Sequence, residues 1–446
     1  MKEKKTKNKN ETDIFIDTKP KLLIYVELFL LFLFSSSNNY IIRNKKLEII
    51  EKLEIPEKQI AYFGIVLQSG RVIGTILIIA IALIFKTFYN MQYATFFAIL
   101  FKSLFFLIYF DLEKIHIAFI WISVFFQGLC HSLIELYFHI WVNHFMVYKL
   151  PFLSFSILAS PLSNIFGYYI SQCGSISCCS LKSFKFISIL DLIFLVTVCK
   201  CDKYFNLLYS KKENLDEYEL NDGRIEELKK KMNISSIFCS DNKYAFISIV
   251  LARAILKFSF VGIYSLIKKY YDTLDGEGEF IEFLIYYFPS IGLIIGAILS
   301  CFNWFKENKI ILYISIFIGI SGTFTIWLNN KIYFEFSIII FYVLANIIIP
   351  SLIQKSFDCF QDEKLHEISY AFNCFFYLLI GNLLSFILNA IFQSETEALM
   401  KIYMLITWVN VFLIFNYNYL MKRNSHASQD NNGKSLLELR EMENNN

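Results

Sequence analysis

Long apolar stretches separated by short polar ones fill most of the chain. Each stretch holds about 20 residues, the length that a helix needs to cross the hydrocarbon core of a bilayer. The pattern predicts twelve spanning helices in two sets of six. The first set covers Leu22–Ile42, Ile60–Phe85, Gln92–Phe110, His116–Asn143, Phe152–Gln172 and Phe184–Cys199. The second set covers Tyr244–Ile267, Phe280–Phe302, Ile310–Leu328, Phe334–Gln354, Ile368–Phe392 and Met400–Leu420.

The composition agrees with this pattern. Of the 446 residues, 56% are hydrophobic, 18% are aromatic and 18% are charged, and the mean hydropathy is +0.48. A soluble globular chain has about 25% charged residues, and this chain lacks the polar residues that would cover a water-facing surface. We therefore predict an all-α polytopic membrane protein that is not an enzyme, and we expect no cofactor.

Polar segments divide the predicted helices into two units. We expect a basic tail over 1–21, a six-helix bundle over 22–199, a linker over 200–243, a second bundle over 244–421 and a polar tail over 422–446. Lys and Arg favour the cytoplasmic side of a membrane, and placing both termini there gives roughly a two-to-one excess of these residues on that side. The sequence leaves the identity of the membrane open. The net charge of +3 gives no sign of nucleic-acid binding, and we expect a monomer in the lipid bilayer.

A glycine motif repeats at matching places in the two halves. The second predicted helix contains Gly70 and Gly74 within the pattern Gly-x-x-Ile-Gly-x-Ile-Leu, and the eighth contains Gly292 and Gly296 within the same pattern. Glycines four residues apart let another helix approach closely. We therefore expect both helices to pack tightly on partners, with the interface between the halves as one candidate. Because this spacing is common in membrane helices, chance repetition is the alternative.

Three of the six prolines lie inside predicted helices, at Pro161, Pro289 and Pro350. Proline weakens the local hydrogen-bond ladder of a helix and marks bends. The fifth helix also contains Gly167, in a segment that the eleventh helix repeats faintly around Gly381. We expect these residues to act in packing or gating.

The fourth predicted helix carries His131, Glu135 and His139 at a spacing of four residues, which places them on one face. Ionisable residues inside a membrane cost about 2.5 to 3.5 kcal/mol each, so they are candidates for function. Histidine titrates near neutral pH, and His131 and Glu135 could couple proton and solute movement. The alternatives are a purely structural ion pair between Arg71 and Glu135, and a position of His139 at the headgroup level. A metal site is not favoured, because the spacing is not that of a zinc protease.

Three cations fall near mid-depth in other predicted helices. Arg71 lies on the second helix, and Arg253 and Lys257 share a face of the seventh. Fixed positive charges opposite a single carboxylate favour an anionic or zwitterionic solute.

Twelve helices in six-plus-six form, a long middle loop and the repeated glycines resemble the major facilitator superfamily of secondary transporters. The resemblance implies that helices one, two, four, five, seven, eight, ten and eleven line a central cavity. It thereby implies that Arg71, His131, Glu135, Arg253 and Lys257 converge on one water-filled pocket. From their chemistry we expect Arg71, Arg253 and Lys257 to bind the solute there, and His131 and Glu135 to couple it to protons.

The same resemblance places helices three and six at the periphery. These helices carry Lys102 and Asp191. For two ionisable side chains away from the cavity, we expect snorkelling towards the interface or pairing with each other rather than a role in transport.

Within the superfamily, the first half is most similar to the spinster group of lipid and lysophospholipid transporters. The similarity rests on residues 47–53 with 61–64, on 128–131, and on 161–168, which reads PLSNIFGY. The chain departs from the superfamily at 86–91, where the charged signature is replaced. It departs from the group at His131, which stands in place of a carboxylate.

Three functional hypotheses follow. The first is a secondary transporter that moves a small organic anion or zwitterion by alternating access, with protons as a candidate coupling ion. The second is a spinster-like transporter of lysolipids, and the third is a transport-inactive membrane receptor or scaffold. Cys173, Cys178 and Cys179 cluster in one predicted outer loop, where either a disulfide or free thiols are allowed.

Overall fold

The structure is a computed structural model that describes residues 18–44, 60–85, 91–109, 117–146, 148–172, 185–201, 234–274, 278–327, 330–360, 363–392 and 395–444. Within these ranges the regular structure is helical throughout. The three clustered cysteines at 173, 178 and 179, and most of the predicted linker, lie outside the described residues.

The first half contains six long helices. They are α2 (Thr18–Asn44), α4 (Ile60–Phe85), α5 (Met91–Tyr109), α6 (Ile117–Phe145), α7 (Lys149–Gln172) and a sixth helix over 185–201. Each coincides with one predicted apolar stretch, because a run of about 20 apolar residues satisfies its backbone polar groups in lipid only as a helix.

The second half repeats this arrangement with short additions. After the short helix α10 (Ile234–Cys239) come α11 (Lys243–Asp272), α12 (Gly278–Leu299), the 3₁₀ turn η2 (Asn303–Lys306), α13 (Asn308–Trp327) and α14 (Lys331–Asp358). The eleventh span consists of α15 (Glu363–Phe376), a π-helical segment η3 (Tyr377–Leu384) and α16 (Ser385–Ile391). The last helix, α17 (Thr396–Asn444), is 49 residues long and continues far beyond its predicted end.

Ten of the helices in the described ranges are long and apolar enough to cross a membrane. The helix α12 adds a shorter apolar stretch at Tyr287–Leu299. The prediction of an all-α polytopic membrane protein is thereby confirmed.

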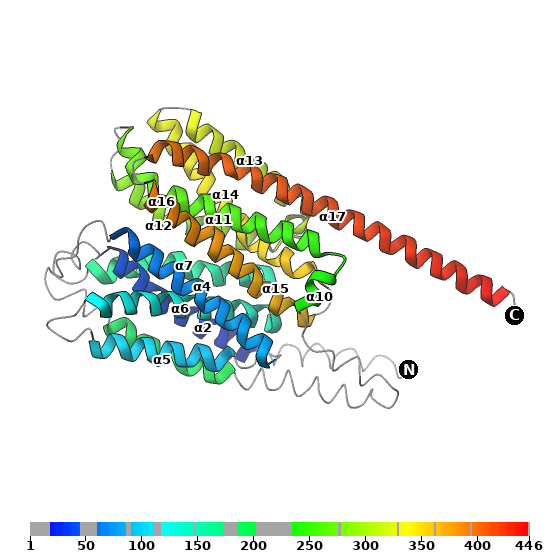
Figure 1. Ribbon diagram of the computed structural model, residues 1–446, viewed down its shortest axis with the longest axis horizontal. Coiled ribbons are helices and arrows are strands. Elements are labelled where there is room, and N and C mark those ends of the chain that lie inside the picture. The colour runs from blue at the N-terminus through cyan, green and yellow to red at the C-terminus, as the bar shows by residue number, and fades with distance from the viewer. Residues whose placement is uncertain are drawn as a thin grey trace, which may run out of the picture.

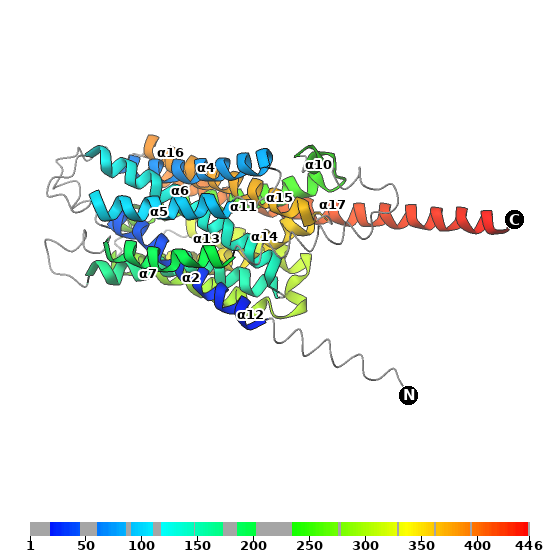
Figure 2. The same cartoon turned by 90° about the horizontal axis from the view of Figure 1, so that it is seen from below.

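The two halves lie side by side, the first running from blue through cyan to green and the second from green to red (Figure 1). The helix α17 extends from the end of the bundle at which α2 begins, as both views show (Figures 1 and 2). We call this end the terminal end and the opposite one the distal end. Between the halves, α4 packs against α15, η3 and α16, and α7 packs against α12 and α14.

The repeated glycines allow close helix packing within each half. A Cβ atom on Gly70 of α4 would meet the carbonyl oxygen of Phe125 on α6, and one on Gly292 of α12 would lie 2.6 Å from the carbonyl oxygen of Val343 on α14. The tight packing that the repeat predicts is confirmed. The glycines themselves face helices of their own half, whereas other residues of α4 and α12 pack against the opposite half.

Candidate functional site

A cavity of about 480 Å³ lies between the two halves. Its walls come from α2, α4, α6 and α7 of the first half, and from α11, α12, α14 and the η3–α16 segment of the second. These are the helices that the superfamily resemblance implies. In the described ranges, α5, α13, α17 and the helix 185–201 contribute no wall residue, so the expected division into lining and peripheral helices is confirmed.

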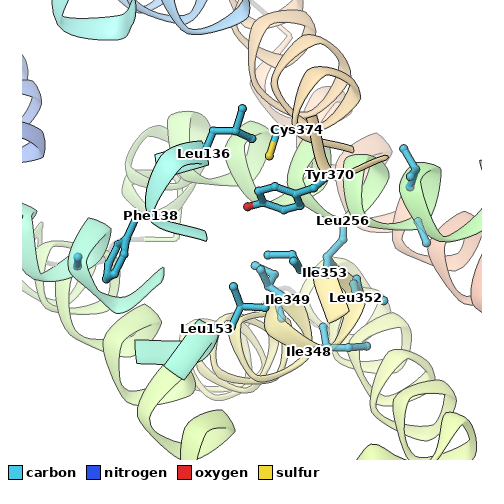
Figure 3. Close-up of a cluster of buried hydrophobic side chains, with 14 of the residues drawn as sticks. Leu136, Phe138, Leu153, Leu256, Ile348, Ile349, Leu352, Ile353, Tyr370 and Cys374 are labelled. Carbon is cyan, nitrogen blue, oxygen red and sulfur yellow. The ribbon is translucent and has the colours of Figure 1, made fainter. Parts of the chain in front are cut away.

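Buried side chains from both halves close this cavity on the terminal side. Figure 3 shows Leu136 and Phe138 from α6 and Leu153 from α7 grouped with Ile349 and Ile353 from α14. On the distal side the cavity extends between the first turns of α4 and the last turns of α16. The arrangement therefore leaves the cavity nearer to the distal end.

A chain of polar contacts runs along the wall of the first half. The guanidinium of Arg71 donates from Nη2 to Oε2 of Glu135 at 2.7 Å. The same carboxylate oxygen lies 3.6 Å from Nε2 of His131, and Nδ1 of His131 is hydrogen-bonded with the hydroxyl of Ser36 at 2.9 Å. All four side chains line the cavity. The ion pair considered as a structural alternative is thus present, and it lies in the cavity wall.

Lys257 of α11 differs from Arg71 in that no carboxylate among the described residues neutralises its positive charge. Its Nζ lies 5.2 Å from the ring centroid of Phe260 and 5.3 Å from that of Tyr377, and no carboxylate of the described chain pairs with it. Glu135 already engages Arg71. The wall therefore presents one positive charge in excess, on Lys257.

Arg253 does not reach the cavity wall, although the sequence places it at the right depth. It is only 1% exposed and donates from Nη1 to Oδ1 of Asn373 at 2.9 Å. Its guanidinium carbon lies 4.1 Å from the ring centroid of Tyr377, a distance that favours a cation–π contact. Tyr377 does line the cavity. Arg253 therefore packs on the buried side of a wall residue and does not itself face the cavity.

His139 lies at the contact between the halves. It is fully buried, and its Nδ1 is hydrogen-bonded with the hydroxyl of Tyr370 on α15. Its side chain is therefore not exposed to lipid headgroups, as the alternative considered for it would require.

The predicted packing and gating residues have different surroundings. Pro161 of α7 and Pro289 of α12 line the cavity from opposite halves, whereas Pro350 and Gly167 are buried within α14 and α7. Gly381 falls inside the π-helical segment, where a Cβ atom would lie 2.8 Å from Cβ of Lys257.

Lys102 and Asp191 form an ion pair away from the cavity. Nζ of Lys102 lies 2.7 Å from Oδ2 of Asp191, and neither side chain is exposed. Lys102 also donates to the hydroxyl of Ser35 at 2.7 Å. The pairing that we expected as one alternative for these residues is confirmed.

Sequence reasoning missed the amides of the wall. Asn382 of η3 donates from Nδ2 to Oε1 of Gln68 on α4 at 3.0 Å, which joins the halves, and Asn164, Asn346 and Asn389 also line the cavity. Amide side chains inside apolar helices could have indicated these wall residues, because such groups need polar partners in a membrane.

No protein-family model and no curated protein sequence matches the chain. Several solved structures do match it in fold. The proton:xylose symporter XylE bound to 6-bromo-6-deoxy-D-glucose has a TM-score of 0.65 at 12% identity, over 89% of this chain and 95% of the other. The human organic anion transporter MFSD10 has a TM-score of 0.61 at 8% identity, over 89% and 99%. A variant of the E. coli fucose:proton symporter FucP has a TM-score of 0.58 at 13% identity, over 89% and 98%.

These likenesses establish the fold. XylE is a major facilitator superfamily protein, and the chain has the major facilitator fold that its sequence predicts. The closer similarity to the spinster group stays a prediction.

Proposed function

We propose that the protein is a secondary transporter that moves a small organic anion or zwitterion across a membrane by alternating access. The observation that carries this proposal is the cavity between the halves with the unpaired ammonium of Lys257 in its wall. A cavity of about 480 Å³ falls in the range of about 300 to 1,000 Å³ that holds small organic ligands.

The charge of the wall supports an anionic group on the solute. A lysine held in a membrane cavity without a carboxylate partner costs free energy, and a solute carboxylate or phosphate would supply the missing partner. The amides of Asn382 and Asn389 and the rings of Phe260 and Tyr377 suit the polar and apolar parts of such a molecule. One structural neighbour is named as an organic anion transporter, which agrees with this solute class.

The contacts of Glu135 support proton coupling. In the structure this carboxylate is held by Arg71. A solute anion that draws Arg71 away would leave Glu135 without its cation, so the carboxylate would take up a proton. His131, 3.6 Å from the same oxygen, is placed to pass that proton. Two structural neighbours are named as proton symporters, which agrees with this coupling.

The test is transport by the full chain reconstituted in liposomes that contain a pH-sensitive dye. Organic anions, zwitterions, lysolipids and a neutral sugar are added in turn to the wild-type protein and to Glu135→Gln. We expect saturable acidification with an anion or zwitterion, and its loss in the variant. Flux of lysolipids alone would favour the spinster-like function, and the absence of flux for every class would favour the receptor or scaffold.

A further inference from the structure

A second cavity, of about 620 Å³, lies at the terminal end between the two halves. We call it the terminal pocket. One side is formed by residues 148–152, where α7 begins, and the other by residues 300, 301, 303 and 311 and by the last turns of α14. It shares no wall residue with the central cavity in the described ranges, so the proposed transport leaves it unexplained.

The terminal pocket carries more positive than negative charge. Lys149 contributes from the first half and Lys355 from the second. Asp358 is the acidic wall residue, with Oδ2 at 3.6 Å from Nζ of Lys355, and its Oδ1 accepts from Gln354 at 3.0 Å. Lys149 pairs with no carboxylate in the part of the chain that the structure describes. One ammonium in the pocket is therefore available for an anion.

One exposed aromatic residue lines the terminal pocket, and two more are sequence neighbours of the wall residues Cys301 and Asn303. Tyr148 is 70% exposed, Phe302 is 50% exposed and Trp304 is 48% exposed. Aromatic side chains gather where the hydrocarbon meets the headgroups of a bilayer. The pocket therefore lies at the depth at which phosphate groups of lipids are found.

We infer that the terminal pocket binds a phosphate group, held by Lys149 from the first half and by Lys355 from the second. The amide of Asn303 also lines the pocket and suits a remaining phosphate oxygen, whereas the hydroxyl of Ser300 donates to the carbonyl oxygen of Ala297. The phosphate belongs to an anionic lipid headgroup or to a soluble organic phosphate. Both sources share the same chemistry, and the test separates them.

Binding at this place would affect the relative position of the halves. Lys149 and Lys355 belong to opposite halves, so a phosphate between them holds the terminal end closed. A ligand that binds one of two conformations more tightly shifts the population towards it. This consequence rests on the proposed alternating access, whereas the binding itself does not.

Cys301 offers a direct readout, because this exposed thiol lines the pocket. The full chain is placed in vesicles of phosphatidylcholine alone, of phosphatidylcholine with phosphatidylglycerol, or of phosphatidylcholine with glycerol phosphate on both sides. The alkylation rate of Cys301 by the uncharged reagent N-ethylmaleimide is followed by peptide mass spectrometry. Cys239, an exposed thiol of α10 outside the pocket, is the internal control.

We expect Cys301 to react several-fold more slowly in vesicles with phosphatidylglycerol, and Cys239 to be unaffected. Lys149→Gln and Lys355→Gln should each remove most of this protection. Lys309→Gln, at an exposed lysine of α13 outside the pocket, should leave it unchanged. Protection by glycerol phosphate alone would assign the pocket to a soluble phosphate. No protection by either, or protection that survives both pocket variants, would overturn the inference.

Discussion

The hydroxyl of Tyr370 on α15 and Nδ1 of His139 on α6 are hydrogen-bonded across the interface between the two halves. Both side chains are fully buried, and Tyr370 lies within the apolar cluster that closes the central cavity on its terminal side (Figure 3). Under the proposed alternating access, opening of the terminal end would separate α6 from α15 and break this bond. The pair is thus a local measure of the closed state.

We predict that Tyr370→Phe favours opening at the terminal end. Loss of one hydrogen bond costs about 1 kcal/mol, which corresponds to about a fivefold shift between the two conformations. The readout is the labelling rate of Cys374, a buried thiol of the same cluster, with a membrane-permeant maleimide. Labelling should accelerate about fivefold if opening limits it. The matched control is Tyr419→Phe, at a tyrosine that is 57% exposed. An equal rate in both variants would show that the bond does not hold the closed state.

Lys257→Met should weaken anion binding without weakening the fold. The ammonium lies beside aromatic rings and has no carboxylate partner in the described residues, so its removal leaves no unpaired charge behind. Hydrogen bonds to charged groups contribute about 1.5 to 3 kcal/mol, which corresponds to roughly a 10- to 150-fold loss of affinity for the anion. The concentration dependence of uptake measures this loss, and the Tm in detergent checks the fold.

The control for that experiment is Lys268→Met, at an exposed lysine of the same helix. It should leave uptake unchanged. Normal anion affinity in Lys257→Met would remove the main support for an anionic solute.

Gly70→Ala is expected to destabilise the first half. The added Cβ would meet the backbone carbonyl of Phe125, which can move only with α6. Overpacking of this kind costs about 1 to 3 kcal/mol, so the Tm of the purified protein should fall. Gly322→Ala is the matched control, because its Cβ would make ordinary contacts at 3.4 Å and beyond. If the two variants melt alike, the close approach of α4 and α6 is not needed for stability.

Lys102→Met should be strongly destabilising, because it leaves Asp191 as an unpaired buried charge. Removing one partner of a buried ion pair costs about 3 to 5 kcal/mol. The double variant Lys102→Met with Asp191→Leu removes both charges and should recover most of the lost stability. Thermal melts of the three proteins in one detergent give the comparison. A double variant no more stable than Lys102→Met would contradict the pairing.

Much of the fold could be read from the sequence because the bilayer imposes a local rule. Each apolar stretch must satisfy its own backbone polar groups, and so the second span covers Ile60–Phe85 both as predicted and as found. The same rule says nothing of helices outside lipid, and the continuation of α17 to Asn444 was missed. The π-helical segment at Tyr377–Leu384 was missed as well, because hydropathy does not distinguish a π-helical turn from an α-helical one within a span.

Some features of the candidate site could likewise be predicted from the sequence, and others could not. Helical spacing placed His131 and Glu135 on one face, and the structure brings both to the cavity wall with Arg71. Spacing also grouped Arg253 with Lys257. Both lie against the ring of Tyr377 in the structure, but only Lys257 lines the cavity, and Arg253 is buried behind that ring.

The sequence by itself thus determined the spanning helices, their division into two halves and the ionisable residues that the membrane makes costly. These properties follow from the hydropathy and spacing of neighbouring residues. The tertiary structure alone decided that Gly70 packs within its own half, that His139 bonds to Tyr370 across the interface, and that Lys149 and Lys355 share one pocket. Each of these depends on contacts between side chains far apart in the chain, which only the packing of whole helices brings together.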